Sequence, residues 1–282
     1  MADGTVSNVS DTALWVAAYR AQESARRKPL FVDRLAERVA GERGRAIVAA
    51  SPRQLRSGWS IVTRTKLIDD LILASIAAGC DRVLNLAAGM DTRPYRLPLP
   101  VGLPWIEADL PGIIDEKERL LAGETPECAL RRERVDLSDD DARAAFLRTA
   151  LAGASRALVL TEGLLGYLDG GVVRALGRDL AAAGPPIRWW IFDLFSPGAL
   201  RLLRGTRGHA AGPLFKFAPE EGVGFFEPLG WRVLEVQSIT RMAVRFRRAP
   251  LRLYPLALLP QVNPRRPGNV PWFAVIRLER AG

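Results

Sequence analysis

The stretch Val83-Leu-Asn-Leu-Ala-Ala-Gly-Met-Asp-Thr-Arg-Pro-Tyr-Arg-Leu97 decides the fold, because it joins an apolar strand to a turn of small residues. The strand is expected over Arg82–Leu86. Gly89 lets a ligand approach the backbone of the turn, and the small Ala87 and Ala88 keep the turn open. The turn lacks the three glycines and the following helix N-terminus of a dinucleotide fingerprint, which argues against NAD and nucleoside triphosphates.

Strands and helices alternate beyond this stretch, which predicts an α/β fold with a largely parallel sheet covered on both faces. Before it, residues 64–78 predict a helix that ends at Gly79. The other strands are expected at 105–109, 134–136, 157–160, 188–193, 232–236 and 272–278, and the other helices at 113–121, 139–151 and 172–183. The last strand ends close to the end of the chain, which suits an antiparallel hairpin at one edge of the sheet.

Two regions stand outside this alternation. Residues 12–39 contain little Gly or Pro, and their apolar residues recur at helical spacing, so they predict a helical N-terminal extension. Residues 196–224 are rich in Gly, Arg and Pro and show weak periodicity, which indicates an insertion. We expect residues 1–282 to form one domain.

Composition limits the class of protein. A hydrophobic fraction of 48% and a charged fraction of 25% are typical of soluble globular proteins. The first ten residues lack the features of an export signal, and no stretch reaches the roughly 18 apolar residues of a membrane span. Cys80 and Cys128 have no ligand-type residues around them, so we expect neither a disulfide framework nor a metal site. These features predict a cytoplasmic protein without a membrane partner.

The net charge of +9 would attract nucleic acid, an anionic membrane or an acidic substrate if it were concentrated on one face. The basic residues instead form short clusters, nearly all arginine, at 26–28, 131–132, 247–248 and 265–266. A G+C-rich genome produces the same arginine bias, so we expect dispersed charge and no nucleic-acid partner. The alternative is an arginine-lined pocket for a carboxylate or phosphate.

Acidic residues follow the next strands, at the edge of a parallel sheet where ligands bind. Glu107 and Asp109 end the second strand, and either could accept hydrogen bonds from ribose hydroxyls. Asp109 is favoured because Pro111 breaks the strand just beyond it, whereas Glu107 could equally be a solvated carboxylate. After the third strand, Asp136 offers an acceptor to an adenine amino group, and Leu137 offers an apolar side chain to the ring.

Glu162 directly follows the four apolar residues of the fourth strand, a position that is hard to reconcile with surface charge. The alternative is a buried structural glutamate paired with a base. A row of acids suits a cationic, polyhydroxylated ligand, and S-adenosylmethionine carries a sulfonium, a ribose and an adenine. Its carboxylate needs a cation, which Arg64 or Lys66 could supply from the helix before the first strand.

Five ordered segments resemble the leucine carboxyl methyltransferase family, and more closely its bacterial branch of small-molecule O-methyltransferases, which includes polyketide-pathway members. They are Arg64–Asp69, Leu86–Arg93, Glu107–Pro111, Val135–Leu137 and Glu162–Leu168. The resemblance covers residues 12–168 well and the remainder in outline. It implies a class I methyltransferase, Rossmann-like fold whose seven-stranded sheet has an antiparallel last strand. It also implies a helical lid over residues 12–60.

The resemblance assigns six residues to an S-adenosylmethionine site: Arg64, Gly89, Asp109, Asp136, Leu137 and Glu162. Arg64 would hold the carboxylate of the cofactor, and Glu162 its amino group. Gly89 would lie against the methionine portion, and Asp109 would hold the ribose. Asp136 and Leu137 would hold the adenine.

Two details of the resemblance bear on the structure. Ala87 stands where such turns often have glycine, and alanine is tolerated there if its φ is negative. The N-terminal residues Trp15, Tyr19 and Arg20 resemble the part of the lid that covers the substrate.

The 196–224 insertion is expected to shape the substrate pocket with this lid.

These features predict an S-adenosylmethionine-dependent O-methyltransferase that acts on a carboxylate or hydroxyl of a small molecule, in secondary metabolism. The alternatives are a peptide or protein C-terminal carboxyl methyltransferase, an NAD-type oxidoreductase on a similar fold, and a nucleic-acid-binding protein suggested by charge alone. His209 is the single histidine, and we expect it in an exposed loop. The lack of another histidine favours an acceptor that needs no general base, and Arg20 could pair with such an acceptor. No catalytic residue is assigned.

Overall fold

Seven strands form one sheet in the order β3-β2-β1-β4-β5-β7-β6. They are seen in a computed structural model that describes residues 9–51, 57–184, 186–205 and 214–281. The strands are β1 Arg82–Leu86, β2 Pro104–Asp109, β3 Ala129–Arg134, β4 Ala157–Thr161, β5 Ile187–Phe195, β6 Trp231–Ser238 and β7 Phe273–Arg280. β7 is antiparallel to both of its neighbours, and the pairs among β1 to β5 are parallel. The predicted fold class is confirmed.

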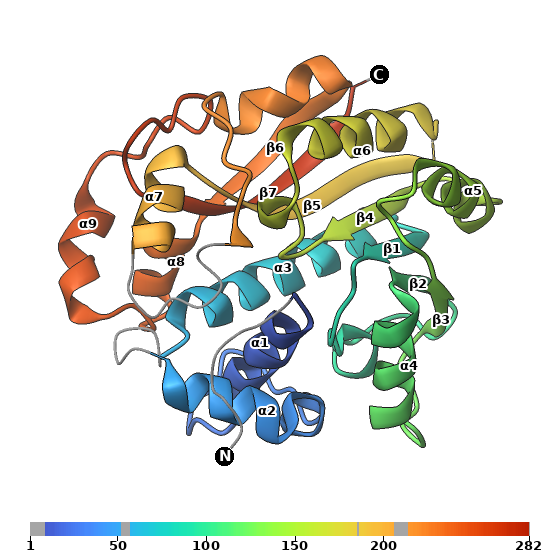
Figure 1. Ribbon diagram of the computed structural model, residues 1–282, viewed down its shortest axis with the longest axis horizontal. Coiled ribbons are helices and arrows are strands. Elements are labelled where there is room, and N and C mark those ends of the chain that lie inside the picture. Colours follow the sequence, from blue (N-terminus) through green and yellow to red (C-terminus); the bar gives the residue numbers. More distant parts are fainter. Residues whose placement is uncertain (1–8, 52–56, 185, 206–213, 282) are drawn as a thin grey trace.

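Helices cover both faces of the sheet (Figure 1). The α-helices are α1 Val9–Ser24, α2 Ala36–Ala50, α3 Trp59–Ala77, α4 Pro111–Leu120, α5 Asp140–Leu151, α6 Gly170–Ala182, α7 Pro197–Gly205, α8 Ile239–Arg245 and α9 Tyr254–Leu258. The 3₁₀ helices are η1 Arg93–Tyr95, η2 Leu165–Tyr167, η4 Gly222–Leu229 and η5 Leu251–Leu253. α5 and α6 lie on one face and α3 on the other, with α1 and α2 beyond α3.

Two apolar layers fill the space between the sheet and these helices. Alternate residues of the central strands enter opposite layers, so that Leu84 packs with α5 and α6 whereas Val83 packs with α3 and α8. Every residue of β4 is buried, as expected for a central parallel strand. Trp190 anchors the first layer, and its ring contacts those of Phe226 and Trp231.

Three sequence predictions were wrong in position. The strand expected at 134–136 lies at Ala129–Arg134, because β3 is an edge strand whose partly or fully exposed arginines and glutamate hide the usual apolar signal. The helical extension expected over 12–39 reaches from Val9 to Ala50 and consists of two helices, α1 and α2, joined by a turn that contains Pro29. The 64–78 helix begins earlier, at Trp59.

The C-terminal part holds elements that the sequence pattern did not predict. The 196–224 region contains α7 and the start of η4, while His209 lies outside the described residues. Between β6 and β7 the chain forms α8, η5 and α9, all of them short. None of the helices in the described ranges is long and apolar enough to span a bilayer.

Candidate active site

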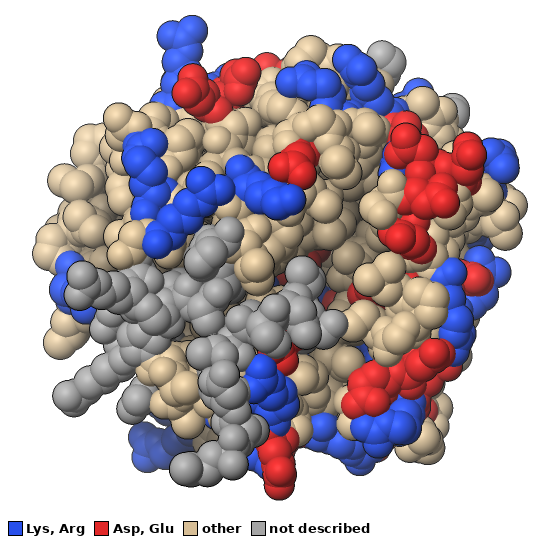
Figure 2. All heavy atoms as spheres, viewed as in Figure 1, with Lys and Arg blue, Asp and Glu red and all other residues tan. Residues whose placement is uncertain are grey.

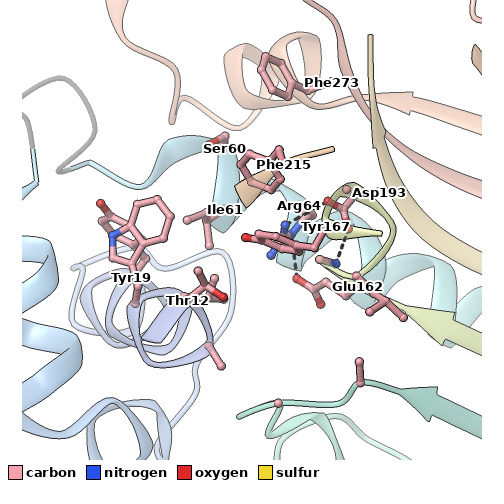
Figure 3. A pocket seen from close by; sticks show the side chains of 18 of the residues that line it. Thr12, Tyr19, Ser60, Ile61, Arg64, Glu162, Tyr167, Asp193, Phe215 and Phe273 are labelled. Atoms are coloured by element: carbon pink, nitrogen blue, oxygen red, sulfur yellow. Dashed lines mark hydrogen bonds and ion pairs between the residues drawn. The ribbon is translucent and has the colours of Figure 1, made fainter. Parts of the chain in front are cut away.

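A cavity of about 830 Å³ lies at the carboxyl ends of the parallel strands, beside the position between β1 and β4 where strand order reverses. Open α/β sheets bind ligands at this position. One wall is polar and is made by Arg64, Asn85, Gly89, Asp91, Asp109, Glu162 and Asp193. The other wall is largely apolar and includes Trp15, Tyr19, Ile61, Leu203, Phe215 and Phe273. Figure 3 shows Thr12 and Tyr19 across an open space from Arg64 and Glu162.

The turn after β1 forms the floor of the polar wall. Gly89 has a φ of +44°, and its N–H donates to Asp109 Oδ2 over 2.7 Å. A Cβ on Gly89 would lie 3.3 Å from the Cβ of Ala13, so α1 packs directly over this turn. Ala87 has a φ of +53°. We had expected alanine to be tolerated here if its φ were negative, and its φ is positive.

Ala87→Gly is expected to stabilise the protein. An L-residue in the left-handed region costs about 1–2 kcal/mol, and glycine avoids this cost while adding some entropy to the unfolded chain. We predict a gain of about 1 kcal/mol in the free energy of unfolding, measured by urea denaturation. Ala88→Gly is the control, because Ala88 is not among the residues with positive φ and should lose stability instead. Equal effects of the two changes would contradict the interpretation.

The two acids at the end of β2 have different environments. Asp109 lines the cavity and accepts N–H bonds from Gly89 and Leu110. Burial raises the pKa of Asp109, and these two bonds oppose the shift. Glu107 is fully buried and binds Lys117 over 2.8 Å and Arg132 over 3.0 Å. Glu107 is therefore a structural ion pair, and neither the ribose ligand nor the solvated carboxylate that we had considered.

Arg64 stands in the polar wall beside Glu162 and Asp193 (Figure 3). Its Nε donates to Glu162 Oε1 over 2.9 Å, and its Nη1 donates to Asp193 Oδ2 over 3.2 Å. Desolvation alone would lower the pKa of Arg64, but Asp193 and Glu162 raise it. Within the part of the chain that the structure describes, Nη2 has no hydrogen-bond partner. One edge of the guanidinium therefore remains for an anion.

Glu162 is shared between Arg64 and a second arginine, Arg93. Arg93 is almost fully buried, and it binds Asp69 over 2.7 Å, Asp91 over 2.7 Å and Glu162 over 2.6 Å. Burial would raise the pKa of Glu162, but the two guanidinium groups hold it below its ordinary value. Glu162 is thus ionised and fixed in orientation. Glu162 lines the cavity and is also paired with two arginines, and its role toward a cofactor stays a prediction.

Arg20, on α1, connects this helix to the turn after β1. Its Nε donates to Asp33 over 2.9 Å and its Nη2 donates to the carbonyl of Met90. The side chain is buried, and Thr92 donates to the same carboxylate. These contacts use Nε and Nη2, and Arg20 also lines the cavity, so the pairing of Arg20 with an acceptor stays a prediction.

The predicted adenine residues lie apart from the cavity lining. Asp136 is exposed, and its carboxylate accepts from the N–H and hydroxyl of Ser138. Leu137 packs against the apolar layer under α5 and α6. The structure thus brings together Arg64, Gly89, Asp109 and Glu162 around one cavity. The roles of Asp136 and Leu137 stay predictions.

Residues 13–181 match the family model of leucine carboxyl methyltransferases. A Frankia alni relative is 36% identical over 242 residues, which cover 80% of this chain and 83% of the relative. A Streptomyces coelicolor relative is 31% identical over 284 residues, with 90% and 92% covered. Both are named as S-adenosylmethionine-dependent methyltransferases. The chain belongs to the leucine carboxyl methyltransferase family.

Solved structures agree with this fold. A Thermobifida fusca protein assigned as a methyltransferase aligns with a TM-score of 0.56, 15% identity and 94% coverage of both chains. A Streptomyces avermitilis protein aligns with a TM-score of 0.54 and 13% identity over 95% of this chain and 97% of its own. The protein is an S-adenosylmethionine-dependent methyltransferase with the class I architecture.

The donor set of this methyltransferase fits its cofactor. Four carboxylates, those of Asp91, Asp109, Glu162 and Asp193, face one cavity together with the free edge of Arg64. Carboxylates suit a sulfonium, an ammonium and ribose hydroxyls, and an arginine suits the single carboxylate of S-adenosylmethionine. Because residue 89 is a glycine, no side chain stands between the backbone of the turn and α1.

Several residues of the methyltransferase site were not found from the sequence. Asp193 follows the rule that identified Asp109 and Glu162, since we expected the fifth strand to end at this residue. Arg93 and Asp91 lie inside the stretch that decides the fold and bind each other, but the other two acidic partners of Arg93, which are Asp69 and Glu162, are distant in sequence. Leu253 comes from η5, an element that was not predicted.

Proposed function

We propose that this methyltransferase methylates a carboxylate or hydroxyl oxygen of an apolar small molecule of secondary metabolism. The observation that carries the proposal is the contrast between the two walls of one cavity. The wall at the strand ends is polar, and the wall beneath the helices is aromatic. A volume of about 830 Å³ is within the range of small-molecule sites, about 300–1,000 Å³.

The polar wall would hold the cofactor. Arg64 would bind its carboxylate through Nη2, and Glu162 its amino group. Asp109 would accept from the ribose, with the backbone of Gly89 against the methionine portion. Asp136 and Leu137 are proposed for the adenine. When bound, S-adenosylmethionine supplies a methyl group already activated by the sulfonium, so the chain mainly positions the acceptor and excludes water.

The aromatic wall would orient the acceptor. Tyr167, Phe195 and Phe215 form a contiguous ring cluster beside the polar wall. The described residues that line the cavity include no histidine, lysine or cysteine. Burial raises the pKa of Tyr167 to about 12, so its phenol is neutral at pH 7 and is a poor general base. An acceptor oxygen that is already ionised, a carboxylate or an acidic hydroxyl, fits this wall best.

The lid favours a small molecule over a protein C-terminus. Helix α1 packs over the turn after β1, and α7 and η5 contribute to the opposite side of the same cavity. A folded protein could insert only a narrow tail between these elements. A free apolar acid or phenol would fit without moving them.

A panel assay with a methyl-labelled cofactor tests the proposal. We expect label transfer to apolar aromatic carboxylates or phenols and none to a peptide that ends in a free carboxylate. Phe215→Ala should raise the KM of the acceptor by about tenfold, because a buried aromatic contact is lost, and should leave S-adenosylhomocysteine affinity unchanged. Transfer to the peptide alone would contradict the proposal. A Tm that rises with NAD and not with S-adenosylhomocysteine would favour the oxidoreductase alternative.

A further inference from the structure

The positive charge of the chain is concentrated in one segment. Residues 239–272, between β6 and β7, contain seven arginines and no acidic residue, against a net charge of +9 for the whole protein. From the short basic clusters we had expected dispersed charge. In the structure α8, η5 and α9 form one element between β6 and β7.

The same segment exposes large apolar side chains. We call residues 251–259, which include η5 and α9, the leucine cap. Leu251 is 82% exposed, Leu258 is 86% exposed, and Leu256 and Leu259 are more than half exposed. Apolar side chains that gather on an exposed helical tip mark an interaction site. In Figures 1 and 2 the surface around α9, at the left edge, is mostly tan with some blue and shows no red.

Unpaired arginines surround the leucine cap. Arg245, Arg247, Arg252 and Arg266 are exposed and have no acidic partner among the described residues. Arg245 and Arg247 precede the leucine cap in the sequence, Arg252 lies within it, and Arg266 follows it. They are therefore available to an anionic partner.

A second basic stretch adjoins this surface. Arg248 forms a buried ion pair with Glu23 over 2.7 Å, and its Nη2 also donates to the carbonyl of Lys28. These contacts fix the exposed triad Arg26-Arg27-Lys28, at the end of α1, beside the arginine-rich segment. The basic surface thus extends from residues 239–272 onto the residues that follow α1.

We propose that the leucine cap and its arginines dock on the surface of an anionic lipid bilayer. Leucines can enter the boundary between headgroups and acyl chains while arginines contact lipid phosphates, which is how interfacial helices bind. A second copy of the chain fits less well, because a symmetric contact would place these arginines against each other. The docking needs no spanning helix, and it replaces our expectation of no membrane partner.

Docking would bring the cavity next to lipid. Arg252 and Leu253 belong to the leucine cap and also line the cavity. An apolar acceptor dissolved in the bilayer would then reach the site without crossing water. This consequence rests on the proposed function, whereas the docking itself does not.

Vesicle co-sedimentation of the full chain tests the docking. The probes are vesicles of phosphatidylcholine with phosphatidylglycerol, and vesicles of phosphatidylcholine alone, at physiological ionic strength. We expect binding to the first and little to the second. Leu258→Asp should weaken binding by about tenfold or more, because it removes a side chain from the boundary and adds a negative charge. The matched control is Val101→Asp. Val101 is 83% exposed, much like Leu258, but it lies in the turn before β2. This change should alter binding by less than about twofold.

Four outcomes would overturn the proposal. The first is no binding of the wild-type chain to anionic vesicles. The second is an equal loss in Leu258→Asp and Val101→Asp, which would indicate unspecific attraction by net charge. The third is a wild-type dimer in light scattering that Leu258→Asp dissociates, which would assign the surface to a second copy. The fourth is binding to polyglutamate that Leu258→Asp weakens as much as vesicle binding, which would assign it to an acidic protein. Methyl transfer by Leu258→Asp is measured in the same preparation. If transfer is retained while vesicle binding is lost, the docking and the proposed function are tested separately.

Discussion

Arg64→Met is expected to weaken S-adenosylhomocysteine binding by about 10- to 100-fold, because a charge-assisted hydrogen bond contributes about 1.5–3 kcal/mol. Methyl transfer should fall with it. The guanidinium fixes the side chains of Glu162 and Asp193, and its remaining edge is the proposed site of the cofactor carboxylate. Isothermal titration calorimetry measures the change.

The control for this prediction lies on the same helix. Lys66 is two residues further along α3, and it pairs with the exposed Asp70 as an i,i+4 pair. Lys66→Met removes a positive charge at a similar place in the chain without touching the cavity, and it should leave the affinity unchanged. Equal losses in the two variants would show that general charge, and not the geometry at Arg64, governs binding.

Arg93→Met is expected to cause the largest loss of stability, about 3–5 kcal/mol, because it leaves buried carboxylates without their counter-ion. Arg93 is 2% exposed and binds Asp69, Asp91 and Glu162, which come from α3, the turn after β1 and the end of β4. Urea denaturation gives the free energy of unfolding. Arg119→Met, which breaks the exposed pair with Glu116 on α4, is the control and should have no measurable effect.

The pH dependence of this difference gives a second test of the Arg93 cluster. Burial would raise the pKa of Asp91 and of Glu162, but Arg93 and other basic groups hold both below their ordinary values. A carboxyl with a depressed folded-state pKa contributes stability above its unfolded pKa, about 4, and loses it as pH falls through the folded value. The gap between wild type and Arg93→Met should therefore be full at neutral pH and shrink below about pH 4. A constant gap down to acidic pH would contradict the assignment of the stability to these ion pairs.

The part of the site that could be predicted depends on local signals. Apolar periodicity located β1, β2 and β4, and the rule that ligands bind beyond the ends of parallel strands then selected Asp109 and Glu162. Arg64 followed from the charge that such a ligand requires. Each of these inferences needs only the residues next to one element.

The remainder depends on contacts between distant residues. Whether Arg93 is buried or exposed is decided by Asp69 and Glu162, 24 and 69 residues away, so a short window of sequence cannot show it. Glu107 could be assigned only once Lys117 of α4 was seen to reach it. The positive φ of Ala87 likewise follows from how the turn packs, not from the residue type.

The short C-terminal elements escaped prediction for a related reason. Helices of five to seven residues carry too few turns for a periodic signal, and α9 begins with a proline beside its first residue. A leucine at the surface and a leucine in the core look alike in a short stretch of sequence. Their exposure is what distinguishes an interaction surface from a core, and only the structure shows it.

The most direct measurement of the central claim is a crystal structure of the protein with S-adenosylhomocysteine. We predict the ligand in the cavity at the carboxyl ends of β1, β2 and β4, with the Asp109 carboxylate on the ribose hydroxyls. Arg64 Nη2 should bind the ligand carboxylate, and Glu162 its amino group. A ligand bound elsewhere, or bound in the cavity with Arg64, Asp109 and Glu162 all beyond hydrogen-bonding distance, would contradict the account.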